Sequence, residues 1–265
     1  MTDSQQLPNP DDALDFDDGE PLKYGLNLLL FALTVPSVFF SGAMLVDRTI
    51  ADNLPHRLLE IWRGWPFAVP LLAILLAHEF GHYIAARVHR VPASLPYFIP
   101  LPELSPFGTM GAIIAMRGRI RSRAALLDIG AAGPIAGMVV ALPMLAIGLH
   151  WSGIGPNPPA DYSQEGQSLL YLLMKRIFLG SIPAGQDAQL HPTATAGWVG
   201  FLITMINLLP WGQLDGGHIA FALFGDRQHA LARGVRQFLL LLFGYNLLRF
   251  CVPVILHRSS MSYGF

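Results

Sequence analysis

Two histidines and a glutamate stand at metal-binding spacing inside one apolar stretch of this chain. His78 and His82 are four residues apart, so on a helix they lie one turn apart on the same face. Two imidazoles placed in this way can bind one metal ion, and Glu79 between them is the usual acid/base partner. The pattern therefore predicts a zinc site that still lacks one protein ligand, because a catalytic zinc has three.

The third ligand must come from another part of the chain. A third histidine six residues after His82 would fall at position 88, which is Val88, so that arrangement is excluded. The downstream glutamates, Glu103 and Glu165, do not stand in helical patterns of suitable length. The search therefore turns to other carboxylates and histidines.

Asp215 is the preferred third ligand. It follows an apolar run and precedes two glycines, which let the backbone turn toward a metal ion. Two alternatives remain open. His218 could be the third ligand instead, or Asp215 could be an ordinary turn residue of the kind common before glycine. An acidic residue at membrane depth favours the functional interpretation.

The composition is that of a membrane protein. Hydrophobic residues make up 52% of the 265 residues and charged residues only 13%, whereas soluble domains contain about 25% charged residues. So few charges cannot cover a soluble surface. The single cysteine, Cys251, excludes an internal disulfide and any zinc site built from several cysteines.

Apolar runs long enough to cross a bilayer recur along the chain. We predict an all-α polytopic membrane protein with five or six transmembrane helices. One shorter amphipathic piece, Leu169–Leu179, is expected to lie at the membrane interface. The apolar runs are 24–46, 64–86, 124–149, 194–210 and 237–256.

The segment 91–116 breaks this helical pattern. Its first part contains five prolines, which exclude a regular helix, and residues 107–114 are apolar, glycine-containing and partly β-branched. Because irregular backbone is not tolerated against lipid, 107–114 is expected to be covered by protein or to line a cavity. We predict a re-entrant or strand-like loop, with an ordinary interfacial loop as the alternative.

Charge distribution predicts an orientation. With the N-terminus inside, the inner segments 87–90, 117–123 and 227–236 carry most of the lysine and arginine residues. The alternating arginines of 117–123 suit a cytoplasmic helix flank, and nucleic-acid binding is not expected. The domain prediction is an acidic disordered tail over 1–22, an integral-membrane domain over 23–258 and a short tail over 259–265.

Three ordered motifs resemble the site-2 protease family of intramembrane zinc metalloproteases. They are 78–82, 128–137 and 207–217, which read HEFGH, DIGAAGPIAG and NLLPWGQLDGG. The similarity covers roughly residues 64–220. One departure is Gly212, where many relatives have a second proline, and we expect it to alter the local turn and not the chemistry.

The resemblance implies a role for each motif residue. His78, His82 and Asp215 would bind one Zn²⁺, Glu79 would be the general base, and Asn207 would help to hold the substrate or the developing oxyanion. The implied fold is the form without PDZ or CBS domains, since about 40 residues between the third and fourth apolar runs are too few for a domain of at least about 50.

The implied function is hydrolysis of peptide bonds in transmembrane segments of other membrane proteins. Its partners would be those substrates and the lipid bilayer, in a bacterial cytoplasmic membrane with the site facing the cytoplasm. The alternative is a metal-binding sensor or transporter that uses the same ligands without hydrolysis, and which would not need Glu79. The sequence does not predict an oligomeric state.

Overall fold

A computed structural model describes residues 24–46, 59–116, 120, 122–156 and 165–261. Three helical segments among these residues are long and apolar enough to cross a membrane: Tyr24–Val46, Ile61–Val88 and Arg123–His150. The protein is therefore an integral membrane protein. The predicted acidic tail over 1–22 and most of the arginine cluster of 117–123 lie outside the described residues.

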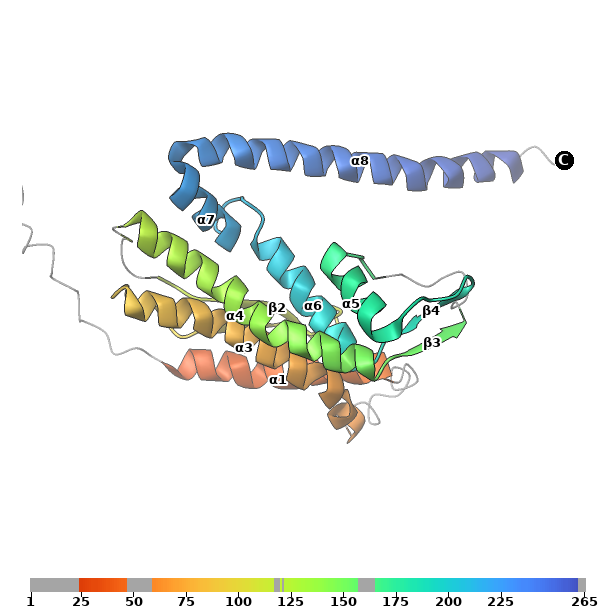
Figure 1. Cartoon of the computed structure of the whole chain (residues 1–265), viewed down its shortest axis with the longest axis horizontal. Helices are drawn as coiled ribbons and strands as arrows, with labels where there is room; N and C mark the ends of the chain where they lie inside the picture. The colour runs from red at the N-terminus through yellow and green to blue at the C-terminus, as the bar shows by residue number, and fades with distance from the viewer. Residues whose placement is uncertain (1–23, 47–58, 117–119, 121, 157–164, 262–265) are drawn as a thin grey trace, which may run out of the picture.

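Helices make up most of the chain. Helices α1, α3 and α4 run side by side, α6 packs against α3 and α4, and α7 leads into the long helix α8 (Figure 1). The elements in order are α1 (Tyr24–Val46), η3 (Ile61–Gly64), α3 (Trp65–Val88), β1 (Tyr97–Pro100), β2 (Thr109–Ile113), α4 (Arg123–His150), β3 (Gly153–Pro156), α5 (Leu169–Leu179), β4 (Gln186–Gln189), α6 (Pro192–Asn207), α7 (Asp215–Phe224), η4 (Gly225–Arg227) and α8 (Gln228–Met261).

The helices predicted over 24–46, 64–86 and 124–149 are confirmed, with ends that differ by no more than two residues. The fourth apolar run, 194–210, corresponds to α6, which has 16 residues and is shorter than the roughly 20 that a full span needs. The fifth, 237–256, lies within α8. Three helices of spanning length are thus observed in the described residues, and a total of five or six stays a prediction.

Small residues set the distance between the central helices. A Cβ atom added to Gly197 of α6 would lie 2.8 Å from the Cα atom of Leu145 in α4. Side chains from α3, α4 and α6 then fill the core between these close contacts, with Ile74, Leu145 and Phe201 as examples. Glycine contacts and van der Waals packing hold the bundle together, as expected where lipid competes equally for apolar surface.

The proline-rich segment contains an antiparallel hairpin. Strands β1 and β2 pair with Tyr97 opposite Ile113 and Phe98 opposite Ala112. A strand is thus observed within 107–114, where the sequence predicted a re-entrant or strand-like loop. Phe98 is buried in the core formed by α1, α3 and α6, so the hairpin is packed into the helical body.

Helix α5 has the bounds expected from the sequence, but its polar face points inward. Tyr171 and Lys175 are buried, whereas Leu169, Leu173 and Ile177 are exposed. The amphipathic pattern is therefore the reverse of that of a helix on a water-soluble protein.

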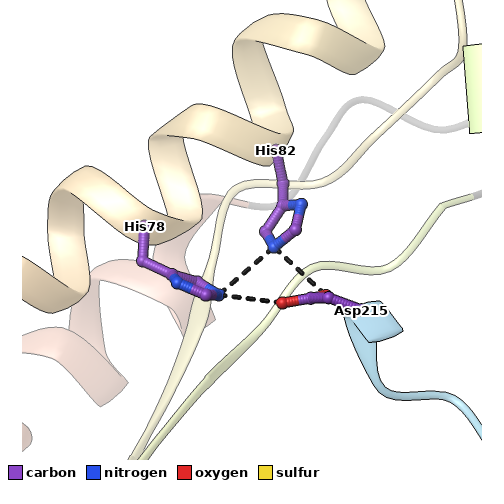
Figure 2. Close-up of side chains that lie close together, drawn as sticks. All are labelled: His78, His82 and Asp215. Atoms are coloured by element: carbon purple, nitrogen blue, oxygen red, sulfur yellow. Dashed lines mark hydrogen bonds and ion pairs between the residues drawn. The ribbon is translucent and has the colours of Figure 1, made fainter. Parts of the chain in front are cut away.

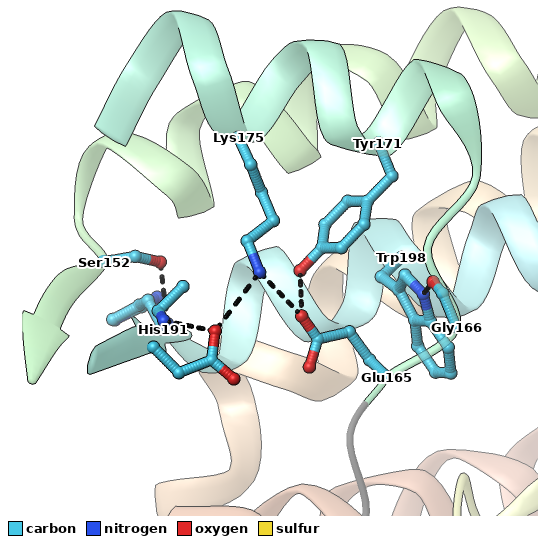
Figure 3. A network of polar contacts seen from close by, with 9 residues as sticks. Ser152, Glu165, Gly166, Tyr171, Lys175, His191 and Trp198 are labelled. Carbon is cyan, nitrogen blue, oxygen red and sulfur yellow. Dashed lines mark hydrogen bonds and ion pairs between the residues drawn. The ribbon is translucent and has the colours of Figure 1, made fainter. Parts of the chain in front are cut away.

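A buried polar network holds α5 against the β3–β4 hairpin (Figure 3). Lys175 Nζ lies 3.0 Å from a Glu165 carboxylate oxygen and 3.6 Å from one of Asp187. The Tyr171 hydroxyl donates to the same Glu165 oxygen at 2.8 Å. Burial raises the pKa of Tyr171, and the Glu165 carboxylate raises it further, so the phenol stays protonated and remains a donor.

Replacing Lys175 with Met should destabilise this end of the protein. The change removes the buried Lys175 ammonium from the half-buried carboxylates of Glu165 and Asp187, which we expect to lower the free energy of unfolding by about 3 kcal/mol. Thermal unfolding of the purified protein in detergent measures the loss. The triple variant Lys175→Met/Glu165→Gln/Asp187→Asn should recover most of it, and equal stability of Lys175→Met and wild type would contradict the assigned role of the network.

Candidate metal centre

Three side chains from two distant parts of the chain converge beside the C-terminal half of α3 (Figure 2). His78 and His82 lie one turn apart on α3, both buried, and their Nε2 atoms are 3.2 Å apart. Asp215, the first residue of α7, places one carboxylate oxygen 3.2 Å from His78 Nε2 and the other 3.2 Å from His82 Nε2. The ligand atoms of the three residues all lie within 4.8 Å of one another.

This triangle has the dimensions of a metal site. Zinc–ligand bonds of about 2.0–2.1 Å in a tetrahedron place neighbouring ligand atoms about 3.3–3.4 Å apart. Buried polar atoms normally have a partner, yet Asp215 Oδ2 is buried without a hydrogen bond of suitable geometry. A cation between the two imidazoles and the carboxylate would satisfy all three groups, so the residues present fit one metal ion.

A backbone carbonyl of α4 orients His82. The Nδ1 atom of His82 lies 2.7 Å from the Ile129 carbonyl oxygen. Because a carbonyl can only accept, this contact places the proton on Nδ1 and leaves the Nε2 lone pair directed toward Asp215. Metal-binding histidines generally have such an outer partner, which fixes both the tautomer and the ring orientation.

Glycines of α4 line one side of the site. A Cβ atom at Gly133 would overlap the His82 ring, and one at Gly137 would lie 3.2 Å from the Cβ atom of His78. A Cβ atom at Gly130 would lie 3.2 Å from the Ile219 side chain of α7. The groups that approach this face of α4 are the two imidazoles and α7.

The turn before Asp215 also depends on glycine. Gly212 has a φ of +59°, a conformation that proline cannot adopt because its ring holds φ near −65°. A Cβ atom at Gly217 would lie 2.5 Å from the Gly212 carbonyl oxygen, so the start of α7 packs directly on this turn. A proline at position 212 would require a different turn.

Three further residues singled out from the sequence lie close by. Asn207 ends α6 and places its Nδ2 atom 3.3 Å from His78 Nε2. Glu79 is buried on α3, next to His78 and three residues before His82. His218, the alternative third ligand, is not part of the His78–His82–Asp215 cluster within the described chain.

Sequence reasoning missed two supports of the site. The Ile129 carbonyl is backbone and carries no residue signature. One residue earlier, Asp128 Oδ2 lies 2.9 Å from His89 Nε2, which ties the end of α3 to α4 beside the carbonyl that orients His82. The only available signal was that the second motif begins at Asp128.

Two histidines on one helix and an aspartate from another, set among apolar helices, are the arrangement of a membrane protein with a metal site. The sequence model of Peptidase family M50 matches residues 66–248. The chain belongs to that family, which is the family of the site-2 proteases, so the resemblance inferred from the motifs is confirmed.

The relatives found by comparison are plant proteins. The chain is 39% identical over 166 residues to "Probable zinc metalloprotease EGY1, chloroplastic" of Arabidopsis thaliana, covering 60% of this chain and 30% of that protein. It is 38% identical over 229 residues to the protein of that name from Oryza sativa subsp. japonica, covering 77% and 38%. The Arabidopsis "Probable zinc metalloprotease EGY2, chloroplastic" is 34% identical over 168 residues, covering 62% and 29%.

The chain therefore spans about a third of the length of these relatives. Their names place them in chloroplasts, and so they lend no support to the bacterial membrane predicted from the sequence.

Adding a methyl group at Gly133 should weaken metal binding. The Gly133→Ala side chain would displace the His82 ring, and we expect zinc affinity to fall about 10–100-fold, as for other changes that misorient a ligand. Competitive zinc titration of the purified protein measures this. Gly137→Ala should have a smaller effect, because its methyl group would meet His78 at 3.2 Å.

Gly234→Ala is the matched control, since nothing lies within 4 Å of the added carbon and zinc affinity should not change. Wild-type affinity in a folded Gly133→Ala protein would show that the space at Gly133 does not determine the position of the His82 ring.

Proposed function

We propose that this chain is a zinc metalloendopeptidase that hydrolyses peptide bonds within transmembrane segments of other membrane proteins. The observation that carries the proposal is the 3.2 Å triangle of His78, His82 and Asp215, with Glu79 buried beside it. Family membership and the names of the plant relatives support the same activity and the same metal.

Each side chain of the site has a distinct task in this proposal. His78, His82 and Asp215 would hold the Zn²⁺ ion. A bound zinc ion supplies a Lewis acid that polarises the scissile carbonyl and activates water. Glu79 would accept a proton from the attacking water and return it to the leaving amine. Asn207 would donate from Nδ2 to the developing oxyanion, a role that its 3.3 Å approach to His78 supports.

The β1–β2 hairpin would hold the substrate. A helical substrate conceals its peptide bonds in its own hydrogen bonds and must unwind before attack. In a two-stranded sheet, β2 has β1 on one side and could receive an extended peptide along its other edge. Because the hairpin packs into the helical body, we infer that it re-enters the membrane.

The proposal also includes the number of membrane spans and their orientation. Five of the predicted five or six spans would be reached if α6 and the apolar part of α8 also cross. The excess of lysine and arginine at 87–90, 117–123 and 227–236 supports a cytoplasmic N-terminus and an active site that opens toward the cytoplasm.

Replacing Glu79 with Gln should abolish hydrolysis and leave metal binding intact. Without the carboxylate the proton transfers lose their acceptor, and we expect cleavage to fall by about 10²–10⁴-fold. The measurement is co-expression with a panel of single-span membrane proteins tagged at both ends, followed by quantification of product. Zinc content should equal that of wild type.

The matched comparison is Asp215→Asn, which should lose both zinc and cleavage because a ligand is replaced. Equal product from wild type and Glu79→Gln would overturn the protease and favour the sensor or transporter. Chelation of zinc from wild type should stop cleavage, and added zinc should restore it.

A further inference from the structure

Helix α1 carries a polar face although it is a membrane-spanning candidate. Asn27, Thr34, Ser37 and Ser41 are all buried in it. Polar groups within a span are costly unless they have partners, so their partners indicate what the helix does. Helix α1 lies outside residues 66–248, the part that matches the family, and contributes no metal ligand.

Two of these side chains bind the backbone of the β1–β2 hairpin. Asn27 Nδ2 donates to the carbonyl oxygens of Leu95 at 2.7 Å and Pro96 at 3.2 Å, the last two before β1. Ser37 Oγ donates to the carbonyl oxygen of Gly108, the last one before β2. The side chains of α1 thus satisfy carbonyl groups at the entry to each strand, where water is scarce.

Packing reinforces these two contacts. The Phe31 ring of α1 meets the Phe98 ring of β1 edge to face, with centroids 5.0 Å apart. Gly108 has a φ of +75°, and a Cβ atom there would lie 2.7 Å from the Ser37 carbonyl carbon, so the turn lies directly on the α1 backbone. The anchors at Asn27 and Ser37 are ten residues apart, about 15 Å along the helix.

The other end of the hairpin packs against α3 and α4. Ser94 N donates to the Ala115 carbonyl oxygen at 2.9 Å, which closes the base of the hairpin. Ile114 packs on the cluster that contains Ala86 of α3 and Ile129 of α4, whose carbonyl orients His82. The hairpin is therefore held between α1 on one side and the helices α3 and α4, which position His82, on the other.

We propose that Asn27 and Ser37 are positioning residues that fix the register of β2 relative to the metal centre, and so determine which substrate bond is cleaved. The proposal rests on the proposed function, in which a substrate peptide pairs with β2. A slip by one residue exchanges the faces of a strand, and a slip by two moves it about 7 Å, farther than a metal site tolerates.

The test compares two anchor variants with a matched control. Asn27→Leu and Ser37→Ala each remove a donor to the hairpin. Thr34→Val removes a buried hydroxyl from the same face, but Thr34 Oγ1 donates to Leu30 O within α1 and not to the hairpin. Hydrogen exchange of residues 97–113 is measured on the full chain with zinc bound. The bonds cleaved are mapped by mass spectrometry on the single-span reporter that wild type cleaves.

The anchor variants should increase exchange across 97–113 about fivefold, since each lost hydrogen bond is worth about 1 kcal/mol. They should also spread cleavage over neighbouring bonds and raise KM more than they lower kcat, while zinc content remains that of wild type. Thr34→Val should match wild type in every measurement, and Ser37→Thr, which keeps the hydroxyl, should restore a single cleaved bond.

Unchanged exchange or an unchanged cleavage map in the Asn27→Leu/Ser37→Ala double variant overturns the proposal. Loss of zinc in either single variant also overturns it, because the effect would then lie in the metal-binding helices. Glu79→Gln separates the two ideas. Cleavage by that variant would overturn the proposed protease function, and with it the role of β2 register. The anchoring of the hairpin by Asn27 and Ser37 is tested separately, by hydrogen exchange alone.

Discussion

The close approach of α3 to α4 is the contact on which the site depends. A Cβ atom at Gly81 of α3 would lie 2.5 Å from the Ala132 carbonyl oxygen, and Gly133 of α4 leaves space for the His82 ring. Because neither helix has a side chain at these points, the His82 imidazole contacts the Ile129 carbonyl and Asp215 at the same time. A larger residue at either position would separate the histidines from the groups that orient them.

This constraint explains why the site needs distant parts of the chain. Helix α3 supplies two histidines but cannot fold back to supply a third ligand. Helix α4 adds no ligand side chain, yet its bare face lets α7 approach at Gly130 and bring Asp215 under the histidines. The glycine pair Gly216–Gly217 lets α7 begin directly against the preceding turn. The glycine positions, which have no side chain, are thus as important to the geometry of the site as the ligands are.

Much of this could be predicted from residue types and spacing. Length and apolarity alone locate α1, α3 and α4, because a span must be about 20 apolar residues long. Helical periodicity places His78 and His82 on one face, and an acidic residue at membrane depth directs attention to Asp215. These features are local, so one sequence is enough to reveal them.

The remaining features depend on tertiary contacts that leave no local signature. Every residue has a backbone carbonyl, so the role of the Ile129 carbonyl cannot be read from its residue type. The inward polar face of α5 depends on Glu165 and Asp187, which lie outside that helix.

Asn27 and Ser37 are polar residues within the apolar run 24–46, and only the fold reveals that the hairpin is their partner. In an apolar bundle every buried donor needs an acceptor, and the acceptors of Asn27 and Ser37 are carbonyl groups of non-helical backbone. A first helix without ligands can therefore still contribute to the geometry of a site by holding the strand beside it.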